Sequence, residues 1–347
     1  MGQRKTLNEI SLIRPVLILL LVLFHSFAPW TGSWKLFSGF EQNKVYWWIG
    51  QFAYSFMLPT FTFISGYIWA FQRETLNRKD SLLHLCRKKF MRLYIPSIVF
   101  SFFYVILYKF PPPTQVSDIW FDYILSILNG TGHMWFLPML FWCFILCQLL
   151  LMIPNALFRI IIVLLLALFN VISLPLQMKQ SCFYLIYFYL GYELWIFKGE
   201  VKKFTTKQYV SCMWILFIIF FVVLINVKEY FHEYFCNIHG FFKLFGVGIV
   251  NLCHIVYSFL GIMAMYITAV FYTNDKTLPK YIYEIGTLCF GVYLYQQFIL
   301  QYLYYYTNLP ILIGNEMLPW IGFAITLLCS VFLSYITRKT KFGRKLI

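Results

Sequence analysis

Residues 10–28 read ISLIRPVLILLLVLFHSFA, and this stretch decides the class of fold. Its length and apolar character match a helix that crosses the hydrocarbon core of a bilayer. The stretch is too long for the apolar region of a typical cleavable signal peptide, and Arg14 interrupts it. We therefore expect a first membrane-spanning helix that is retained in the mature protein.

The composition of the whole chain extends this prediction. Of its 347 residues, 61% are hydrophobic and 12% are charged, whereas a soluble domain has about 25% charged residues. We predict an all-α integral membrane protein, a bundle of about ten transmembrane helices that forms one domain over residues 1–347 with no appended soluble domain. The expected spans are 10–29, 47–71, 93–110, 132–153, 157–175, 181–197, 208–227, 245–272, 284–306 and 317–337.

The positively charged residues predict how the chain is oriented in the membrane. The net charge is +15, and the basic residues lie between the apolar stretches, which leaves no segment for a nucleic-acid-binding domain. With a cytoplasmic N-terminus, 21 basic residues fall in cytoplasmic segments and 6 on the opposite side, while Arg14 lies within a span. The positive-inside rule then predicts an even number of spans and two cytoplasmic termini.

Arg14 and His25 are the most informative polar residues inside a predicted span. They are eleven residues apart, so their side chains point in nearly the same direction and lie about 16 Å apart along a helix axis. Ionisable residues inside membranes often mark functional sites. Two structural alternatives remain: each side chain extends to its own membrane interface, or His25 is a hydrogen-bonded packing residue.

Two short motifs combine small, polar and aromatic residues. Ser65 and Gly66 lie late in the second span, where glycine permits close helix contact and a serine hydroxyl bonds across it. His133 and Trp135 open the fourth span from the outer side. Tryptophan is common at membrane interfaces, and His133 is a candidate contact for a ligand on the outer side.

A basic segment precedes the third span. It comprises Arg87, Lys88, Lys89 and Arg92. Such a cluster binds phosphates through charge and hydrogen bonds, but it equally sets membrane topology or contacts anionic lipids.

Three roles remain possible for several other polar residues: proton relay, substrate contact and hydrogen bonding between helices. They are Glu193, Glu284, Gln296, Gln297 and Gln301. The spacing of His232, Cys236 and His239 is compatible with a metal, but no fourth ligand accompanies them. We therefore expect no metal site.

Taken in order, these motifs resemble those of the acyltransferase-3 family of bacterial membrane O-acyltransferases. The resemblance covers residues 8–337 and rests on the combination, since each motif is weak by itself. The motifs are Arg14 and His25, Phe63-Ile64-Ser65-Gly66-Tyr67, the basic segment running into Arg92 and Pro96, Trp135-Phe136-Leu137, Leu190-Gly191-Tyr192 and Tyr293-Leu294.

The resemblance implies a reaction and roles for the residues that match. The donor is a cytoplasmic acyl-CoA, usually acetyl-CoA, and the acceptor is a hydroxyl of a surface glycan; no bound cofactor is implied. His25 and Arg14 match the catalytic pair, His133 and Trp135 lie on the acceptor side, and Ser65 belongs with the donor-binding residues. The other donor-binding positions are Arg87, Lys88, Lys89 and Arg92.

The implied mechanism runs from the cytoplasmic face outward. The basic segment holds the phosphates of CoA, the pantetheine arm passes Arg14, and His25 is the general base for the acceptor hydroxyl. Many family members have histidine where this chain has Gln296, which cannot act as a base. The alternatives are a transporter or flippase of a glycan or lipid-linked intermediate, and a membrane sensor or scaffold. The expected location is the plasma (inner) membrane.

Overall fold

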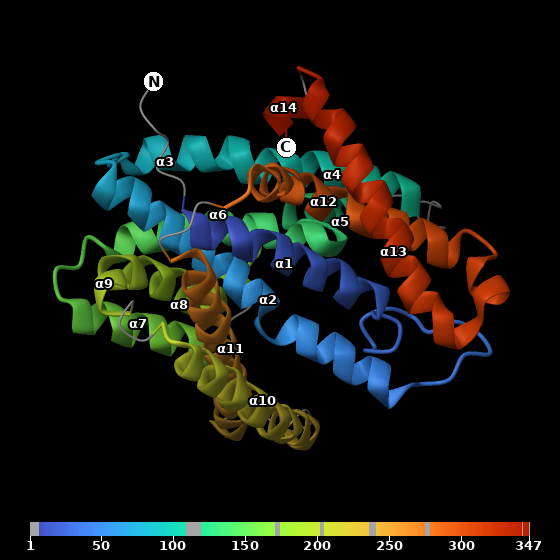
Figure 1. The fold of residues 1–347 in the computed structure, drawn as a ribbon, viewed down its shortest axis with the longest axis horizontal. Coiled ribbons are helices and arrows are strands. Elements are labelled where there is room, and N and C mark those ends of the chain that lie inside the picture. The colour runs from blue at the N-terminus through green and yellow to red at the C-terminus, as the bar shows by residue number, and fades with distance from the viewer. Residues whose placement is uncertain are drawn as a thin grey trace. The chain divides into compact units, whose positions relative to one another are not determined.

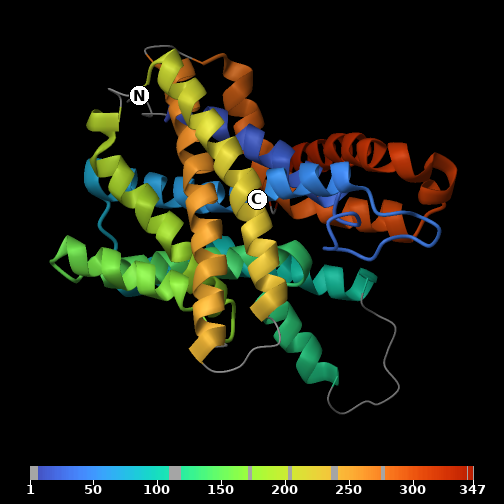
Figure 2. The ribbon, with the colours of Figure 1, turned by 90° about the horizontal axis from the view of Figure 1, so that it is seen from below.

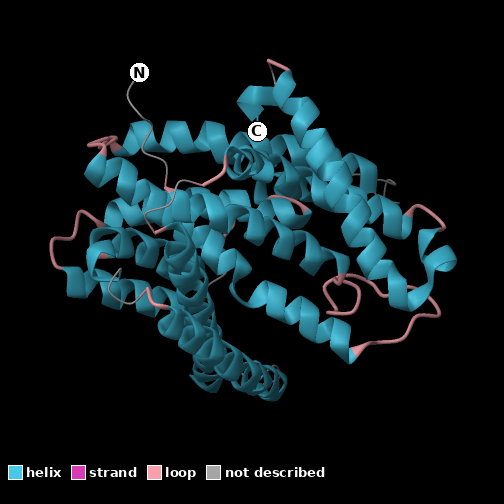
Figure 3. Cartoon of the chain, viewed as in Figure 1, coloured by secondary structure: helices cyan, strands magenta, loops and turns pink. Residues whose placement is uncertain are grey.

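The computed structural model describes residues 7–108, 119–170, 174–201, 205–235, 241–274, 278–341 and 343–346, and within these ranges helices are the regular elements, joined by loops and turns (Figures 1 and 3). The α-helices are α1 (Asn8–Ser26), α2 (Lys44–Ala70), α3 (Leu82–Lys89), α4 (Ile95–Tyr108), α5 (Ile119–Asn129), α6 (Phe136–Leu150), α7 (Ala156–Leu168), α8 (Met178–Ile196), α9 (Lys198–Val201), α10 (Lys207–Phe235), α11 (Phe241–Thr273), α12 (Lys280–Tyr305), α13 (Leu309–Lys339) and α14 (Gly343–Leu346). Two π-helical segments, η1 (Phe71–Thr75) and η2 (Phe90–Tyr94), and one 3₁₀ segment, η3 (Gly132–Trp135), complete the order.

The predicted all-helical membrane class is confirmed, and a helix occupies each of the ten predicted ranges. Within the described ranges, six segments are long and apolar enough to cross a membrane: Asn8–Ser26, Leu82–Tyr108, Gly132–Leu150, Lys207–Phe231, Leu244–Thr273 and Leu309–Lys339. The helices α2, α8 and α12 are long but richer in polar and tyrosine side chains, and α7 has 13 residues. The count of ten spans and the cytoplasmic termini therefore stay predictions.

The chain divides into two units, which are described separately. Unit 1 contains Met1–Leu58 and Met265–Ile347, and unit 2 contains Pro59–Ala264. In unit 1, α1 packs against α12 and α13, which themselves form an antiparallel hairpin (Figure 1). Gly314 has φ 76° and bends the first turns of α13, a conformation that glycine adopts without the strain of a Cβ.

An aromatic cluster closes one end of unit 1. Its buried members are Phe27, Trp30, Tyr46, Leu300, Tyr304 and Leu318. The Tyr304 hydroxyl donates a hydrogen bond to the carbonyl of Ser26 over 2.9 Å. Because the last carbonyls of a helix have no partner within it, this bond satisfies one of them and fixes the end of α1 to α12.

Unit 2 is built on α6 and α8, which pack against each other. The helix α3 contacts α6, α7 packs on α8, and α4 packs on α5. The helices α10 and α11 run side by side, with the rings of Phe221 and Tyr257 6.0 Å apart (Figure 2). Only a small share of α10 is covered by other parts of the protein, so most of its apolar surface is available to lipid.

A close helix crossing in unit 2 joins α2 to α8. Gly66 faces the carbonyl of Phe188, and Gly191 faces the carbonyl of Phe63, so that a Cβ at either glycine would overlap the opposing backbone. Small residues at such crossings let two backbones approach, which is how helices associate where lipid is as apolar as the side chains. Two of the motifs found in the sequence therefore meet each other at this crossing.

The crossing predicts a stability effect for alanine at position 66. Because the obstacle is backbone, Gly66→Ala should lower the stability of the protein by about 1–3 kcal/mol, measured as the melting temperature of the purified protein in detergent. The control is Gly248→Ala in α11, whose Cβ would lie an ordinary 3.6 Å from the Phe169 ring. Equal melting temperatures for the two variants would show that the crossing is not as close as described.

Candidate functional site

His25 lies in the last turn of α1 among aromatic side chains of unit 1. Its side chain is 8% exposed. The imidazole stacks on the indole of Trp34, with ring centroids 5.9 Å apart and an angle of 19° between the planes, and it lies 5.2 Å from the ring of Phe24. The hydrogen bond from Tyr304 to the next residue, Ser26, fixes the backbone beside it.

The segment that presents Trp34 is held to the hairpin of α12 and α13. Trp30 donates from its indole nitrogen to the side-chain oxygen of Asn315 over 2.9 Å. The hydroxyl of Tyr305 donates to the carbonyl of Lys35 over 2.7 Å. Trp34 also contacts the rings of Tyr304 and Tyr305. These contacts keep the indole over His25, a role for Trp34 that sequence reasoning missed because no periodic pattern marks this loop.

Arg14 lies about three turns earlier on the same face of α1 and is half-buried. It is within electrostatic reach of Cys289 on α12. The two helices run parallel, since Tyr283 bonds to Asn8 and Tyr304 bonds to Ser26. Arg14 and His25 therefore lie at successive levels along α12 within unit 1.

A buried polar strip lies between these two levels. Gln296 falls between them along α12 and is fully buried, and its amide nitrogen and oxygen make no hydrogen bond to any described residue. The same holds for the hydroxyls of Thr326 and Ser330 on α13. Buried polar groups are rarely left in this state. The interior of unit 1 thus holds donors and acceptors between Arg14 and His25.

Ser65 and Gly66 take part in packing in unit 2. The Ser65 hydroxyl donates to the carbonyl of Phe61, one turn earlier, over 2.8 Å, a bond that serines commonly make within helices. Gly66 forms the crossing with α8. The structure thus gives Ser65 a local role in α2, and donor binding by it stays a prediction.

The basic segment spans the end of α3 and the π-helical turn η2. Lys89 points inward: it is 8% exposed, and its ammonium lies 3.5 Å from the centroid of the Phe144 ring, a cation–π contact. Lys88 pairs with Asp80 over 2.9 Å. Arg87 and Arg92 are exposed. The four cations are therefore not one surface patch, and two of them stay accessible to a phosphate.

The two outer-side candidates lie at the start of α6. His133 is in the 3₁₀ turn η3 and is 5% exposed. Trp135 follows it, half-buried, with its indole 5.9 Å from the ring of Tyr184. Both side chains therefore sit inside unit 2, where a ligand contact would need access from the end of the helix.

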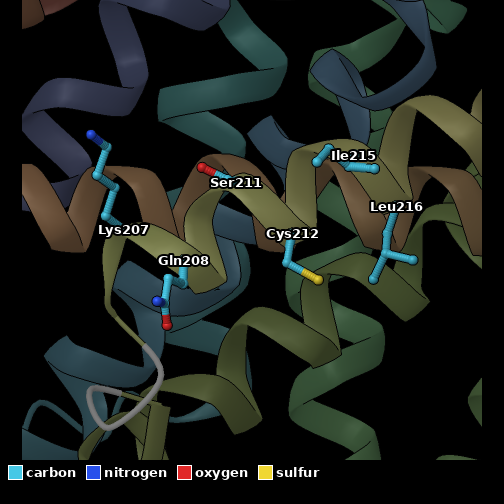
Figure 4. Close-up of a pocket in the computed structure, with 6 residues that line it drawn as sticks. All are labelled: Lys207, Gln208, Ser211, Cys212, Ile215 and Leu216. Atoms are coloured by element: carbon cyan, nitrogen blue, oxygen red, sulfur yellow. The ribbon is translucent and has the colours of Figure 1, made fainter.

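A surface hollow of about 520 Å³ follows the first turns of α10 (Figure 4). Lys207, Ser211 and Ile215 form one row along the helix, and the next row begins with Gln208 and Cys212 (Figure 4). Ile215 is 57% exposed, as expected of a helix face in contact with lipid. The hollow has no pair of groups suited to acid–base chemistry.

The possible metal ligands fall largely outside the described residues. Cys236 and His239 are not described, and the side chain of His232 is not described either. Among the residues that the structure does describe, no group of three His, Cys, Asp or Glu side chains is placed to hold a metal ion.

Comparison with known proteins gives one match. The model of a family described as an acyltransferase domain matches residues 7–339, nearly the whole chain. A search of curated proteins and a search of solved structures found no match. The matched range includes α1 with Arg14 and His25, the α2–α8 crossing and the polar strip of unit 1. The chain belongs to the acyltransferase-3 family and is a membrane acyltransferase.

Proposed function

We propose that the protein is an O-acyltransferase that transfers an acetyl group from cytoplasmic acetyl-CoA to a hydroxyl of a cell-surface or exported glycan. In this proposal it acts in the plasma (inner) membrane with both termini in the cytoplasm. The observation that carries the proposal is the buried imidazole of His25, stacked on Trp34, in a chain of an acyltransferase family.

His25 suits the role of general base because of where it lies. Imidazole gains and loses a proton near neutral pH. Stacking on Trp34 and the fixed end of α1 restrict its orientation, and a positioned base needs no reorganisation during the reaction. The aromatic surroundings exclude water, which favours transfer to an alcohol over hydrolysis of the thioester.

The proposed reaction conserves atoms and charge in one exchange. His25 takes the proton of the acceptor hydroxyl while the oxygen attacks the thioester carbonyl carbon. The new carbon–oxygen bond forms, the carbon–sulfur bond breaks, and the CoA sulfur leaves with the proton returned by the imidazolium. In this proposal, the phosphates of CoA are bound at the cytoplasmic face by Arg87, Lys88, Lys89 and Arg92. Arg14 lies along the path that the donor follows toward His25. His133 and Trp135 remain the acceptor-side candidates.

A glutamine at position 25 tests the role of the imidazole. His25→Gln keeps size and polarity but cannot take up a proton, so transfer of radiolabelled acetyl from acetyl-CoA to the glycan should fall by about 10²- to 10⁴-fold. Its melting temperature should stay near that of the wild type. The control is His84→Gln, because His84 is an exposed histidine in α3. Full transfer by the position-25 variant would refute general-base catalysis by His25.

The indole stacked on His25 predicts a second effect. Trp34→Ala removes the surface that orients the imidazole, and misplacement of a reacting group by about 1 Å can cost about 10²-fold in rate. We expect kcat to fall while KM for acetyl-CoA changes little, and Trp34→Phe to recover most of kcat. Trp214→Ala in α10 is the matched control. A loss of kcat that phenylalanine does not recover would exclude an orienting role for the ring.

A further inference from the structure

A row of small polar residues on α13 follows its contact with α12 in unit 1. The row starts at Gly322, where a Cβ would overlap the ring of Tyr304 on α12. It continues at four-residue intervals through three fully buried residues, Thr326, Ser330 and Ser334. Residues four apart are neighbours on one face of a helix. The face of α13 that packs on α12 therefore carries hydroxyl groups.

The register of the two helices brings Gln296 to the level of this row. The helices run antiparallel, with hydrogen bonds between them near both ends of their contact. Gln296 lies eight residues before Tyr304 on α12, and Ser330 lies eight residues after Gly322 on α13. Since Tyr304 lies against Gly322, Gln296 is at the level of Ser330. Thr326 is one turn nearer to Tyr304.

The same register relates Gln296 to α1. Gln296 lies seven residues after Cys289, which is within electrostatic reach of Arg14. It lies four residues before Leu300, a member of the aromatic cluster at the end of α1. Residues at these spacings share a helix face, and Gln296 is about 10 Å beyond Cys289 along the axis. Residues 17–23 of α1 read Leu-Ile-Leu-Leu-Leu-Val-Leu, so this part of α1 offers the amide no side-chain partner.

The polar atoms at this level are not used within the described part of the protein. The amide nitrogen and oxygen of Gln296 and the hydroxyls of Thr326 and Ser330 are buried without a hydrogen bond to any described residue. The Ser334 hydroxyl, in contrast, donates to the carbonyl of Ser330 one turn earlier over 2.6 Å, as serines in helices commonly do. Thr326 and Ser330 do not make this local bond, so their hydroxyls are available to a ligand.

The ligand group that matches these atoms is a neutral amide. A secondary amide has one N–H donor and one carbonyl acceptor, on opposite sides of its plane. Gln296 can bind either of them, because its side chain both donates and accepts, and a hydroxyl on α13 can bind the other. Gln296, Thr326 and Ser330 carry no charge, so burying a charged group beside them would be costly.

We propose that Gln296, Thr326 and Ser330 bind an amide group in the pantetheine arm of the acyl donor. The identity of the donor rests on the proposed function. Pantetheine has two amides between its thioester and its phosphates, and the three residues lie between Arg14 and His25, along the path proposed for the arm. They hold the donor in place and take no part in proton transfer.

The test measures binding of donors that lack one amide. The probes are CoA and two CoA analogues, each with one of the two pantetheine amides replaced by a methylene chain, titrated calorimetrically against the protein in nanodiscs. Gln296→Met keeps the length of the side chain but has no amide, so it should weaken CoA binding about tenfold. It should bind one of the analogues as tightly as the wild type does, because that analogue lacks the amide that Gln296 binds.

The hydroxyls are tested with variants of similar shape. Thr326→Val and Ser330→Ala should each weaken CoA binding about threefold, the loss expected for one neutral hydrogen bond. The matched control is Ser334→Ala in the same row. Its hydroxyl is already bonded within α13, so CoA should bind this variant as it binds the wild type.

The melting temperature separates ligand binding from a role in packing. A buried polar group without a partner is costly, so Gln296→Met should keep or raise the melting temperature of the protein without CoA. CoA should stabilise the wild type more than the variant. A lower melting temperature for Gln296→Met, with unchanged affinity for CoA, would overturn the proposal and assign the polar groups to a buried water.

Binding and transfer can fail separately. CoA binding that needs Gln296, in a protein that transfers no acetyl group, would support the amide site and refute the proposed acetyl transfer. Acetyl transfer by a protein whose affinity for CoA is the same in all three variants would overturn the amide site alone. A wild type that does not bind CoA would overturn both.

Discussion

The hydrogen bond from the Tyr304 hydroxyl to the Ser26 carbonyl is the interaction on which the candidate site depends. The last carbonyls of a helix lack partners within it, and an unsatisfied carbonyl in an apolar environment costs several kcal/mol. Tyr304 supplies one partner from α12, and the aromatic cluster around it closes over the end of α1. His25, one residue before Ser26, is thereby held in a fixed place under Trp34.

Polar residues within the apolar helices serve two different purposes. Local structure and packing account for Ser65 and Gly66. The Ser65 hydroxyl makes a hydrogen bond within its own helix, and Gly66 permits the close crossing with α8. Gln296 has no such explanation, since its buried amide has no hydrogen-bonding partner among the described residues. The apolar helices therefore contain polar residues that serve packing and at least one buried polar group that packing does not account for.

The sequence was sufficient for the features that follow from length and periodicity. Apolar stretches predicted the helices, and the eleven-residue spacing placed Arg14 and His25 on one face of an uninterrupted α1 despite Pro15. It could not predict that Lys89 turns inward onto Phe144, because residue type alone suggests an exposed cation.

Contacts between distant segments were equally beyond prediction. Nothing in the pattern indicates that Trp34 covers His25, since the loop that carries it has no helical period. Tertiary packing decides such features, and a single sequence does not encode them in any local pattern.

The central claim is that an acyl group leaves a thioester on the cytoplasmic side and becomes bonded to a glycan on the other side. Right-side-out membrane vesicles test this claim when they contain the protein, hold acetyl-CoA radiolabelled in the acetyl group, and are given de-O-acetylated glycan outside. The account predicts alkali-labile label on the external glycan, with an equal amount of free CoA thiol inside. Movement of glycan across the membrane without covalent label would contradict it and identify a transporter.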